Sequence, residues 1–196
     1  MLYSIVKNLL VVPVFKIFFR IEVRGAENIP KHGGFILASN HVSFLDPLAL
    51  GAASGRNFNF MARDSLFKIP VFGSLIKAVD AFPVKRDSAD KAALKEAMRR
   101  VKSGGALALF PEGSRQSNGS VLEQPQPGIG FLAAKLAVPV IPAFISGTEK
   151  ALPRHAKFIR LARVSVSFGK QISIEGRMPY EDIAMRIMDD IRHLAC

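Results

Sequence analysis

Short runs of apolar residues, each bounded by glycine, proline or polar residues, recur along the chain. Such runs predict buried strands at residues 35–38, 106–110 and 138–145, and further strands are predicted at residues 57–61 and 82–84. Residues 21–24 and 164–168 alternate between apolar and polar positions, which predicts an edge strand and a late strand. Apolar residues at helical spacing predict helices over residues 88–103 and 180–194. Strands interleaved with helices indicate a single α/β domain, because no linker, repeat or low-complexity tract divides the chain.

The first 21 residues are almost all apolar but are interrupted by Pro13 and by three basic residues. A membrane-spanning helix needs about 20 uninterrupted apolar residues, so we do not expect one here. Two short helices around Pro13 would be amphipathic, with Ser4, Lys7 and Asn8 on one polar face. The apolar residues left over are Leu9, Leu10, Phe15, Phe18 and Phe19. Because positive charges rim the apolar side, we favour an interfacial membrane anchor over residues 1–20 rather than helices packed on the domain's own core.

The net charge and the cysteine content limit the classes of partner that the protein can bind. The chain of 196 residues carries 27 basic and 16 acidic residues, a net charge of +11, and 49% hydrophobic residues. This charge favours an anionic partner such as a phospholipid surface, a phosphorylated substrate or nucleic acid. We expect no nucleic-acid partner, because no recognised motif or aromatic-basic stripe is present. The single cysteine, Cys196, excludes a disulfide framework and a cysteine-based metal site, and it fits a reducing compartment.

The first candidate for chemistry follows the predicted strand at residues 35–38, where the chain reads S-N-H-V-S-F-L-D-P. A histidine held by a carboxylate has one tautomer and a more basic far nitrogen, which suits it to take a proton from a hydroxyl. On a straight helix His41 and Asp46 would lie about 140° apart, so the chain must turn for them to meet. The alternative is that Asp46 caps a short helix that begins at Pro47. Both can hold, because a carboxylate has two oxygens.

A second candidate follows the strand at residues 106–110, where the chain reads P-E-G-S-R. Backbone N–H groups of the Gly-Ser pair could cradle an oxyanion while Arg115 binds a phosphate. A β-turn stabilised by a pair between Glu112 and Arg115 is an equal alternative. Two cations, Lys85 and Arg86, end the strand at residues 82–84 and indicate either an anion site or a solvated turn. Residues 128–133 match a dinucleotide fingerprint, but no strand precedes them, so we do not expect a nucleotide fold.

Four blocks taken together resemble the glycerolipid acyltransferase family, in particular its bacterial 1-acyl-sn-glycerol-3-phosphate acyltransferases. N-H-x-S-x-x-D-P occupies residues 40–47, and a block with P-x-x-G and P-V-x-R occupies residues 62–86. F-P-E-G-S-R occupies residues 110–115, and V-P-V-x-P-x-x-x-x-G occupies residues 138–147. Each block alone is weak, whereas four in the family's order and spacing are specific.

The resemblance implies roles for these residues. His41 would be the general base that deprotonates a glycerol hydroxyl, and Asp46 would orient it. No acyl-enzyme is required, which agrees with the absence of a G-x-S-x-G motif. The acceptor phosphate would be bound by Arg63, Arg86, Glu112, Gly113, Ser114 and Arg115. The fourth block would help to line the acyl pocket, with Val140, Ile141 and Pro142.

The chain also departs from the family pattern at three positions. Arg63 stands in place of the family lysine, Ser65 in place of a glutamate, and Gln126 in place of a lysine common after the third block. Arginine keeps the charge of lysine but not its geometry. These differences touch the acceptor side, so they bear on the choice of acceptor more than on the reaction.

We therefore expect membrane-associating helices at residues 1–20 and an acyltransferase domain at residues 21–196, with a mixed sheet surrounded by helices. The expected reaction transfers a fatty acyl group from acyl-CoA or acyl carrier protein to the sn-2 hydroxyl of lysophosphatidic acid, without cofactor or metal. Alternatives are another lysolipid or glycerol 3-phosphate as acceptor, or a non-catalytic basic domain that binds membrane or nucleic acid. The expected location is the cytoplasmic face of the inner membrane, bound to an anionic phospholipid surface.

Overall fold

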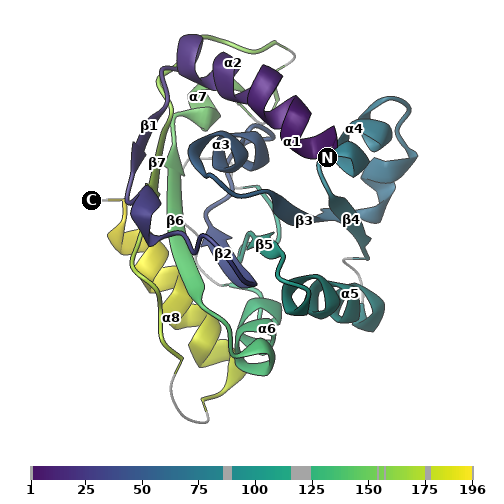
Figure 1. Cartoon of the computed structure of the whole chain (residues 1–196), viewed down its shortest axis with the longest axis vertical. Helices are drawn as coiled ribbons and strands as arrows, with labels where there is room; N and C mark the ends of the chain where they lie inside the picture. The colour runs from purple at the N-terminus through teal and green to yellow at the C-terminus, as the bar shows by residue number, and fades with distance from the viewer. Residues whose placement is uncertain are drawn as a thin grey trace.

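The computed structural model describes residues 2–85, 90–115, 125–153, 155–156, 158–174 and 178–195. Within these residues, seven strands form one sheet in the order β1-β7-β6-β2-β5-β3-β4 (Figure 1). The strands are β1 Glu22–Arg24, β2 Phe35–Ser39, β3 Phe58–Arg63, β4 Ala81–Val84, β5 Ala106–Leu109, β6 Val140–Ser146 and β7 Ser165–Phe168. All neighbouring pairs are parallel except β6 and β7, so the expected mixed sheet is confirmed.

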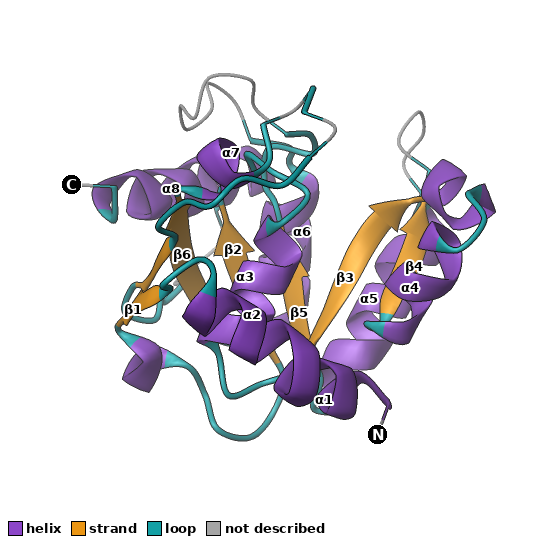
Figure 2. Cartoon of the chain, turned by 90° about the horizontal axis from the view of Figure 1, so that it is seen from above, coloured by secondary structure: helices purple, strands orange, loops and turns teal. Residues whose placement is uncertain are grey.

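Helices cover both faces of the sheet (Figures 1 and 2). The α-helices are α1 Leu2–Val6, α2 Val12–Ile17, α3 Asp46–Ala53, α4 Phe72–Ala78, α5 Lys91–Lys102, α6 Gly128–Leu136, α7 Thr148–Ala151 and α8 Tyr180–His193. A π-helical turn, η1 Lys7–Val11, joins α1 to α2, and short 3-10 turns lie at η2 Ala26–Asn28 and η3 Asp64–Lys68. Helices α2 and α3 pack on one face of the sheet, whereas α5, α6 and α8 pack on the other.

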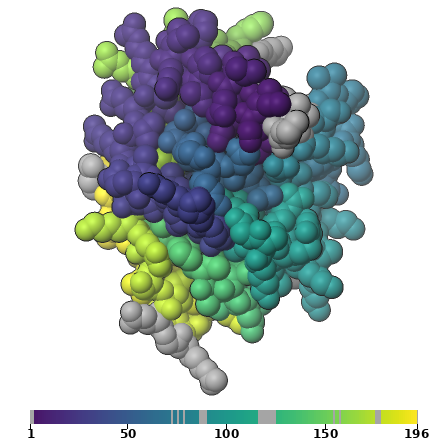
Figure 3. All heavy atoms as spheres, in the orientation of Figure 1, coloured from purple at the N-terminus to yellow at the C-terminus, as the bar shows by residue number. Residues whose placement is uncertain are grey.

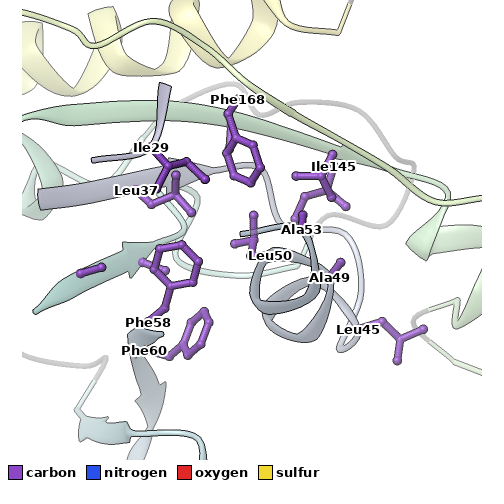
Figure 4. Packing of buried hydrophobic residues seen from close by; sticks show 14 of the residues in the cluster. Ile29, Leu37, Leu45, Ala49, Leu50, Ala53, Phe58, Phe60, Ile145 and Phe168 are labelled. Atoms are coloured by element: carbon purple, nitrogen blue, oxygen red, sulfur yellow. The ribbon is translucent and has the colours of Figure 1, made fainter. Parts of the chain in front are cut away.

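The central strands are apolar throughout because both of their faces are buried. In β2, Phe35 and Leu37 face the core under α2 and α3, and Ile36 and Ala38 face the core under α5, α6 and α8. Figure 4 shows Leu50 reaching from α3 toward aromatic side chains of the sheet. This double burial explains why the strand was recognisable in the sequence as an uninterrupted apolar run.

Most predicted elements are confirmed, with ends that move by one to three residues. The helix predicted over residues 88–103 begins at Lys91, because the Asp90 side chain accepts a hydrogen bond from the backbone N–H of Ala93 at 3.0 Å. The backbone N–H of Lys85 also donates to the Asp90 carboxylate, at 3.0 Å. The bonds from Lys85 and from Ala93, in that order of effect, lower the pKa of Asp90. Residues 88 and 89 lie outside the described residues.

The N-terminal segment differs from the two helices predicted around Pro13. The backbone stays helical from Leu2 to Ile17, and the π turn η1 ends just before the proline. Proline has no N–H and crowds the carbonyl one turn earlier, and a local π turn relieves such a conflict without ending the helix. Pro13 therefore alters the hydrogen-bond pattern but does not separate two helices.

The predicted polar face of this segment is also wrong in part. Lys7 is 5% exposed, and its Nζ donates to the carbonyl oxygen of Arg56 at 3.2 Å. Burial lowers the pKa of Lys7. Ser4 accepts a 2.7 Å hydrogen bond from Asn57, so part of the polar face is turned toward the domain.

The apolar residues of the segment divide between core and surface. Phe15 and Phe19 are 2% and 3% exposed and belong to the core under α2 and α3. Leu9, Leu10 and Phe18 are exposed on the outer side. Figure 3 shows the N-terminal segment lying across one end of the molecule. Within the described part of the chain, no helix is both long and apolar enough to span a bilayer.

Helices α6 and α8 approach closely at a glycine that the sequence placed in a dinucleotide-like motif. A Cβ added to Gly130 would lie 1.9 Å from the carbonyl oxygen of Tyr180. The glycine is therefore required by helix packing, and the motif has a structural explanation at this position.

We expect Gly130→Ala to lower the free energy of unfolding by about 1–3 kcal/mol, because the two helices must separate to admit the methyl group. Gly128→Ala is the matched control, since no described atom lies within 4 Å of a Cβ at that position. The control should be neutral or slightly stabilising. Urea denaturation of both variants measures the difference, and equal effects would contradict the packing argument.

Candidate active site

The chain leaves the sheet at Asn40, directly after β2. The Asn40 side-chain amide donates to the carbonyl oxygen of Ile145 at 2.8 Å and accepts from the backbone N–H of Ile145 at 2.7 Å. This pair of bonds continues the β2–β6 ladder by one step with a side chain in place of a backbone. The backbone of His41 is thereby released from the sheet while its position against β6 is retained.

His41 and Asp46 meet, as the sequence predicted. Nδ1 of His41 lies 2.7 Å from Oδ2 of Asp46. Because an ionised carboxylate can only accept, Nδ1 carries the proton and Nε2 carries the lone pair. The His41 side chain is 14% exposed, so the ring is held in the protein and still reachable from outside.

Asp46 is fully buried and is held by four hydrogen-bond donors. Besides His41, Oδ2 accepts from the backbone N–H groups of Val42 and Ser43 at 2.7 and 2.8 Å. Oδ1 accepts from the hydroxyl of Thr148 at 2.5 Å. A buried carboxylate without such partners would be strongly unfavourable, so these four bonds make the position tenable and also fix its orientation.

The alternative role of Asp46 as a helix cap is wrong. Asp46 is the first residue of α3, the N-cap position is Leu45, and no side chain caps this helix. The carboxylate bonds backward to Val42 and Ser43 instead of forward into the helix. These backward bonds require the chain to turn between Val42 and Asp46. Ser43 closes the turn, because its hydroxyl accepts from the backbone N–H of Leu45 at 3.2 Å.

Phe110 supports the other side of the histidine ring. The two rings stack with their centroids 4.0 Å apart and their planes inclined by 18°. Phe110 follows β5, the parallel neighbour of β2, so both rings project from the carboxyl edge of the sheet. His41 is therefore fixed in orientation by a stacking partner as well as by Asp46.

The P-E-G-S-R loop after β5 contacts the histidine loop directly. The buried carboxylate of Glu112 accepts from the backbone N–H of His41 at 2.9 Å. Gly113 has a φ of 65°, a left-handed conformation that glycine adopts without strain. Gln126 packs over this glycine, since a Cβ on Gly113 would lie 3.0 Å from Cγ of Gln126. Glu112 thus couples the two loops that carry the candidate chemistry.

Two of the cations assigned to the acceptor phosphate, Arg63 and Arg115, follow parallel strands at the same edge of the sheet. The Arg115 guanidinium lies over the ring of Phe44, 3.5 Å from the ring centroid. Ser114, in the same loop, is exposed. Arg63 is exposed at the end of β3, which pairs in parallel with β5. Arg86 lies outside the described residues, after β4, so its predicted role stays a prediction.

The residues assigned to an acyl pocket form part of β6. Val140 and Ile141 are fully buried, and they belong to the two cores on opposite faces of the sheet. Pro142 is buried beside Gly169. Their assignment to the acyl pocket stays a prediction.

Several residues that build the site have no role predicted from the sequence. Thr148 directly follows the fourth block but bonds to Asp46, 102 residues earlier in the chain. Asn40 and Phe110 fell within recognised blocks without an assigned task. Each of the three lies just beyond a parallel strand, β6, β2 or β5, and that position is the signal that could have found them. The described residues contain no group of three or more His, Cys, Asp or Glu side chains placed to hold a metal ion.

Comparisons with known proteins show what this chain is similar to. The sequence model of the Acyltransferase family matches residues 20–146, which include His41, Asp46, Glu112 and Arg115. A chloroplastic 1-acyl-sn-glycerol-3-phosphate acyltransferase of Brassica napus is 34% identical over 139 residues, covering 69% of this chain and 40% of that protein. The Bacillus subtilis 1-acyl-sn-glycerol-3-phosphate acyltransferase is 30% identical over 128 residues, which cover 65% of this chain and 63% of that protein.

The chain thus spans less than two thirds of the length of these relatives. A solved structure is similar over more of the chain. The crystal structure of the 1-acyl-sn-glycerophosphate acyltransferase PlsC from Thermotoga maritima has a TM-score of 0.75 and 25% identity. The similarity covers 95% of this chain and 79% of that one. Because the family's sequence model matches well over half of this chain's residues, the chain belongs to the acyltransferase family.

Proposed function

We propose that this protein transfers a fatty acyl group from an acyl thioester to the sn-2 hydroxyl of 1-acyl-sn-glycerol 3-phosphate, which yields phosphatidic acid. The observation that carries the proposal is the buried contact between His41 and Asp46 beside the P-E-G-S-R loop. The family and the activities for which the Brassica, Bacillus and Thermotoga proteins are named point to the same reaction. The donor is acyl-CoA or acyl carrier protein, and each acts as a substrate rather than a resident cofactor.

The chemistry proceeds without a covalent enzyme intermediate. Nε2 of His41 takes the proton of the acceptor hydroxyl as its oxygen attacks the thioester carbonyl. The resulting tetrahedral oxyanion collapses and the carbon–sulfur bond breaks. The leaving thiolate then takes the proton from the imidazolium, which restores the neutral histidine. Asp46 keeps Nδ1 protonated throughout, and its buried negative charge stabilises the imidazolium while it exists.

Acceptor binding in this proposal uses the loop after β5. The acceptor phosphate lies against the Arg115 guanidinium and the backbone N–H groups of the Gly113–Ser114 turn, with Arg63 and Arg86 adding positive charge. Glu112, which the family resemblance assigned to the phosphate, is here a positioning residue instead. Its carboxylate accepts from the backbone N–H of His41 and would repel a phosphate at close range. The fixed distance between the two loops then sets the distance between the phosphate and the reacting hydroxyl.

Membrane association is the remaining part of the proposal. The acceptor is an amphiphile that resides in a bilayer, and Leu9, Leu10 and Phe18 form the exposed apolar side of the N-terminal segment. With a net charge of +11, the protein suits the anionic cytoplasmic face of an inner membrane. Residues 1–20 therefore serve as an interfacial anchor and also complete the core through Phe15 and Phe19.

His41→Ala should lower acceptor-dependent thiol release by about 100-fold or more, because it removes the general base. Release is measured from acyl-CoA with and without lysophosphatidic acid, and then from acyl carrier protein. His193→Ala, on the exposed end of α8, is the control and should retain full activity. Activity of the His41 variant equal to that of the wild type would end the proposed mechanism.

Arg115→Ala should raise KM for the acceptor by about tenfold or more, because a charge-assisted bond to phosphate is lost. KM for the acyl donor should change little. Arg99→Ala, an exposed arginine of α5, is the charge-matched control. An effect restricted to the donor would contradict the placement of the phosphate at this loop.

Thr148→Val should lower kcat by about 10- to 100-fold with little change in KM, because Asp46 loses a buried hydrogen bond worth about 1–3 kcal/mol. We place Thr148 as a positioning residue that acts through Asp46. Thr148→Ser keeps the hydroxyl and should restore most of kcat. If valine and serine gave the same kcat, the bond would be structural only.

A further inference from the structure

A loop between α7 and β7 exposes large apolar side chains that the proposed reaction does not use. In the segment 158–161, which we term the apolar loop, Phe158 is 81% exposed, Ile159 61% and Leu161 78%. Burying such side chains usually stabilises a protein. Three of them exposed within four residues forgo that gain, and such clusters mark surfaces that meet an apolar partner.

The charged residues of the sequence that flanks the apolar loop, from 150 to 164, are all basic. Residues 150–164 contain five lysines and arginines and no aspartate or glutamate. Arg160, within the loop, and Arg163, just after it, are both exposed. Long basic side chains can keep their charge at the level of lipid headgroups while neighbouring apolar groups enter the acyl layer. This combination matches an anionic lipid surface, and it would not suit a basic or a purely apolar protein partner.

The chain that directly follows the apolar loop lies beside the end of the N-terminal segment. The backbone N–H of Val164 donates to the carbonyl oxygen of Phe19 at 3.0 Å, and the carbonyl of Val164 accepts from the N–H of Glu22 at 2.9 Å. Just before this contact, Ile17 and Phe18 are 69% and 56% exposed. Figures 1 and 3 show the yellow-green segment after α7 at the same upper end of the molecule as α2.

The apolar loop is also joined to the reaction centre through α7. The backbone N–H of Arg160 donates to the carbonyl of Ala151 at the end of α7, at 2.7 Å. Thr148 at the start of α7 bonds to Asp46, and the Ser43 hydroxyl donates to the carbonyl of Leu152 at 2.9 Å. The position of the loop relative to a membrane therefore fixes the position of His41 relative to that membrane.

We propose that the apolar loop is a second membrane-inserting element, which enters the interfacial layer of an anionic bilayer together with the exposed end of α2. Two contact points hold the molecule in one orientation, whereas a single helix would permit rotation about its axis. The reaction centre then lies at headgroup level, where a lysolipid presents its phosphate and free hydroxyl. The consequence for catalysis rests on the proposed function, but the insertion itself does not.

The test compares the wild type with the triple variant Phe158→Ser, Ile159→Ser, Leu161→Ser. Co-sedimentation is measured with vesicles of phosphatidylcholine containing phosphatidylglycerol. The partition coefficient of the triple variant should fall by about tenfold or more, because apolar groups no longer enter the bilayer. Its thermal unfolding should match that of the wild type, since the replaced side chains are exposed. Met185→Ser, a half-exposed residue of α8, is the control and should bind as the wild type does.

Activity assays separate this proposal from the proposed function. The triple variant should keep wild-type thiol release with a short-chain, dispersed lysophosphatidate and lose it with acceptor embedded in vesicles. Failure of the wild type to transfer acyl groups would overturn the proposed function, and the vesicle-binding difference would still support insertion. Unchanged vesicle binding by the triple variant would overturn insertion. Insertion would be overturned as well if the substitutions changed only the oligomeric state measured by light scattering.

Discussion

One buried carboxylate organises the candidate active site. Asp46 receives hydrogen bonds from the His41 ring, from two backbone N–H groups and from Thr148. A charge with no exposure to solvent is stable only when such donors surround it, so the loop after β2 and the start of α7 must both adopt one conformation. The same hydrogen bonds that stabilise the buried carboxylate also fix the tautomer and the orientation of the His41 ring.

The parallel part of the sheet brings distant residues to that carboxylate. β2, β5, β6 and β3 run in the same direction, so the segments that follow them meet at one edge, at which α7 begins (Figure 2). His41, Glu112, Thr148 and Arg63 come from four such segments, and the sheet sets their spacing. Strand ends are suited to this task because the rigid ladder behind them limits how far each loop can move.

The N-terminal segment has two physical tasks that its sequence does not separate. Its inner side completes the core with Phe15 and Phe19, and it buries Lys7 against the carbonyl of Arg56. Its outer side exposes leucine and phenylalanine. Helical periodicity alone assigns lysine to water, whereas here its long side chain reaches a backbone oxygen of the domain. Amphipathicity therefore identified an unusual segment but not which of its sides faces the protein.

The sequence by itself determined the class of the fold, most of the strands and helices, and the pair His41 and Asp46. These features depend on local patterns: apolar runs, helical spacing and a short motif. Only the tertiary structure decided the strand order, the backward direction of the Asp46 side chain, and the contributions of Asn40, Phe110 and Thr148. The reason is physical, because these contacts join segments up to 105 residues apart, and their geometry depends on strand pairing that no local pattern specifies.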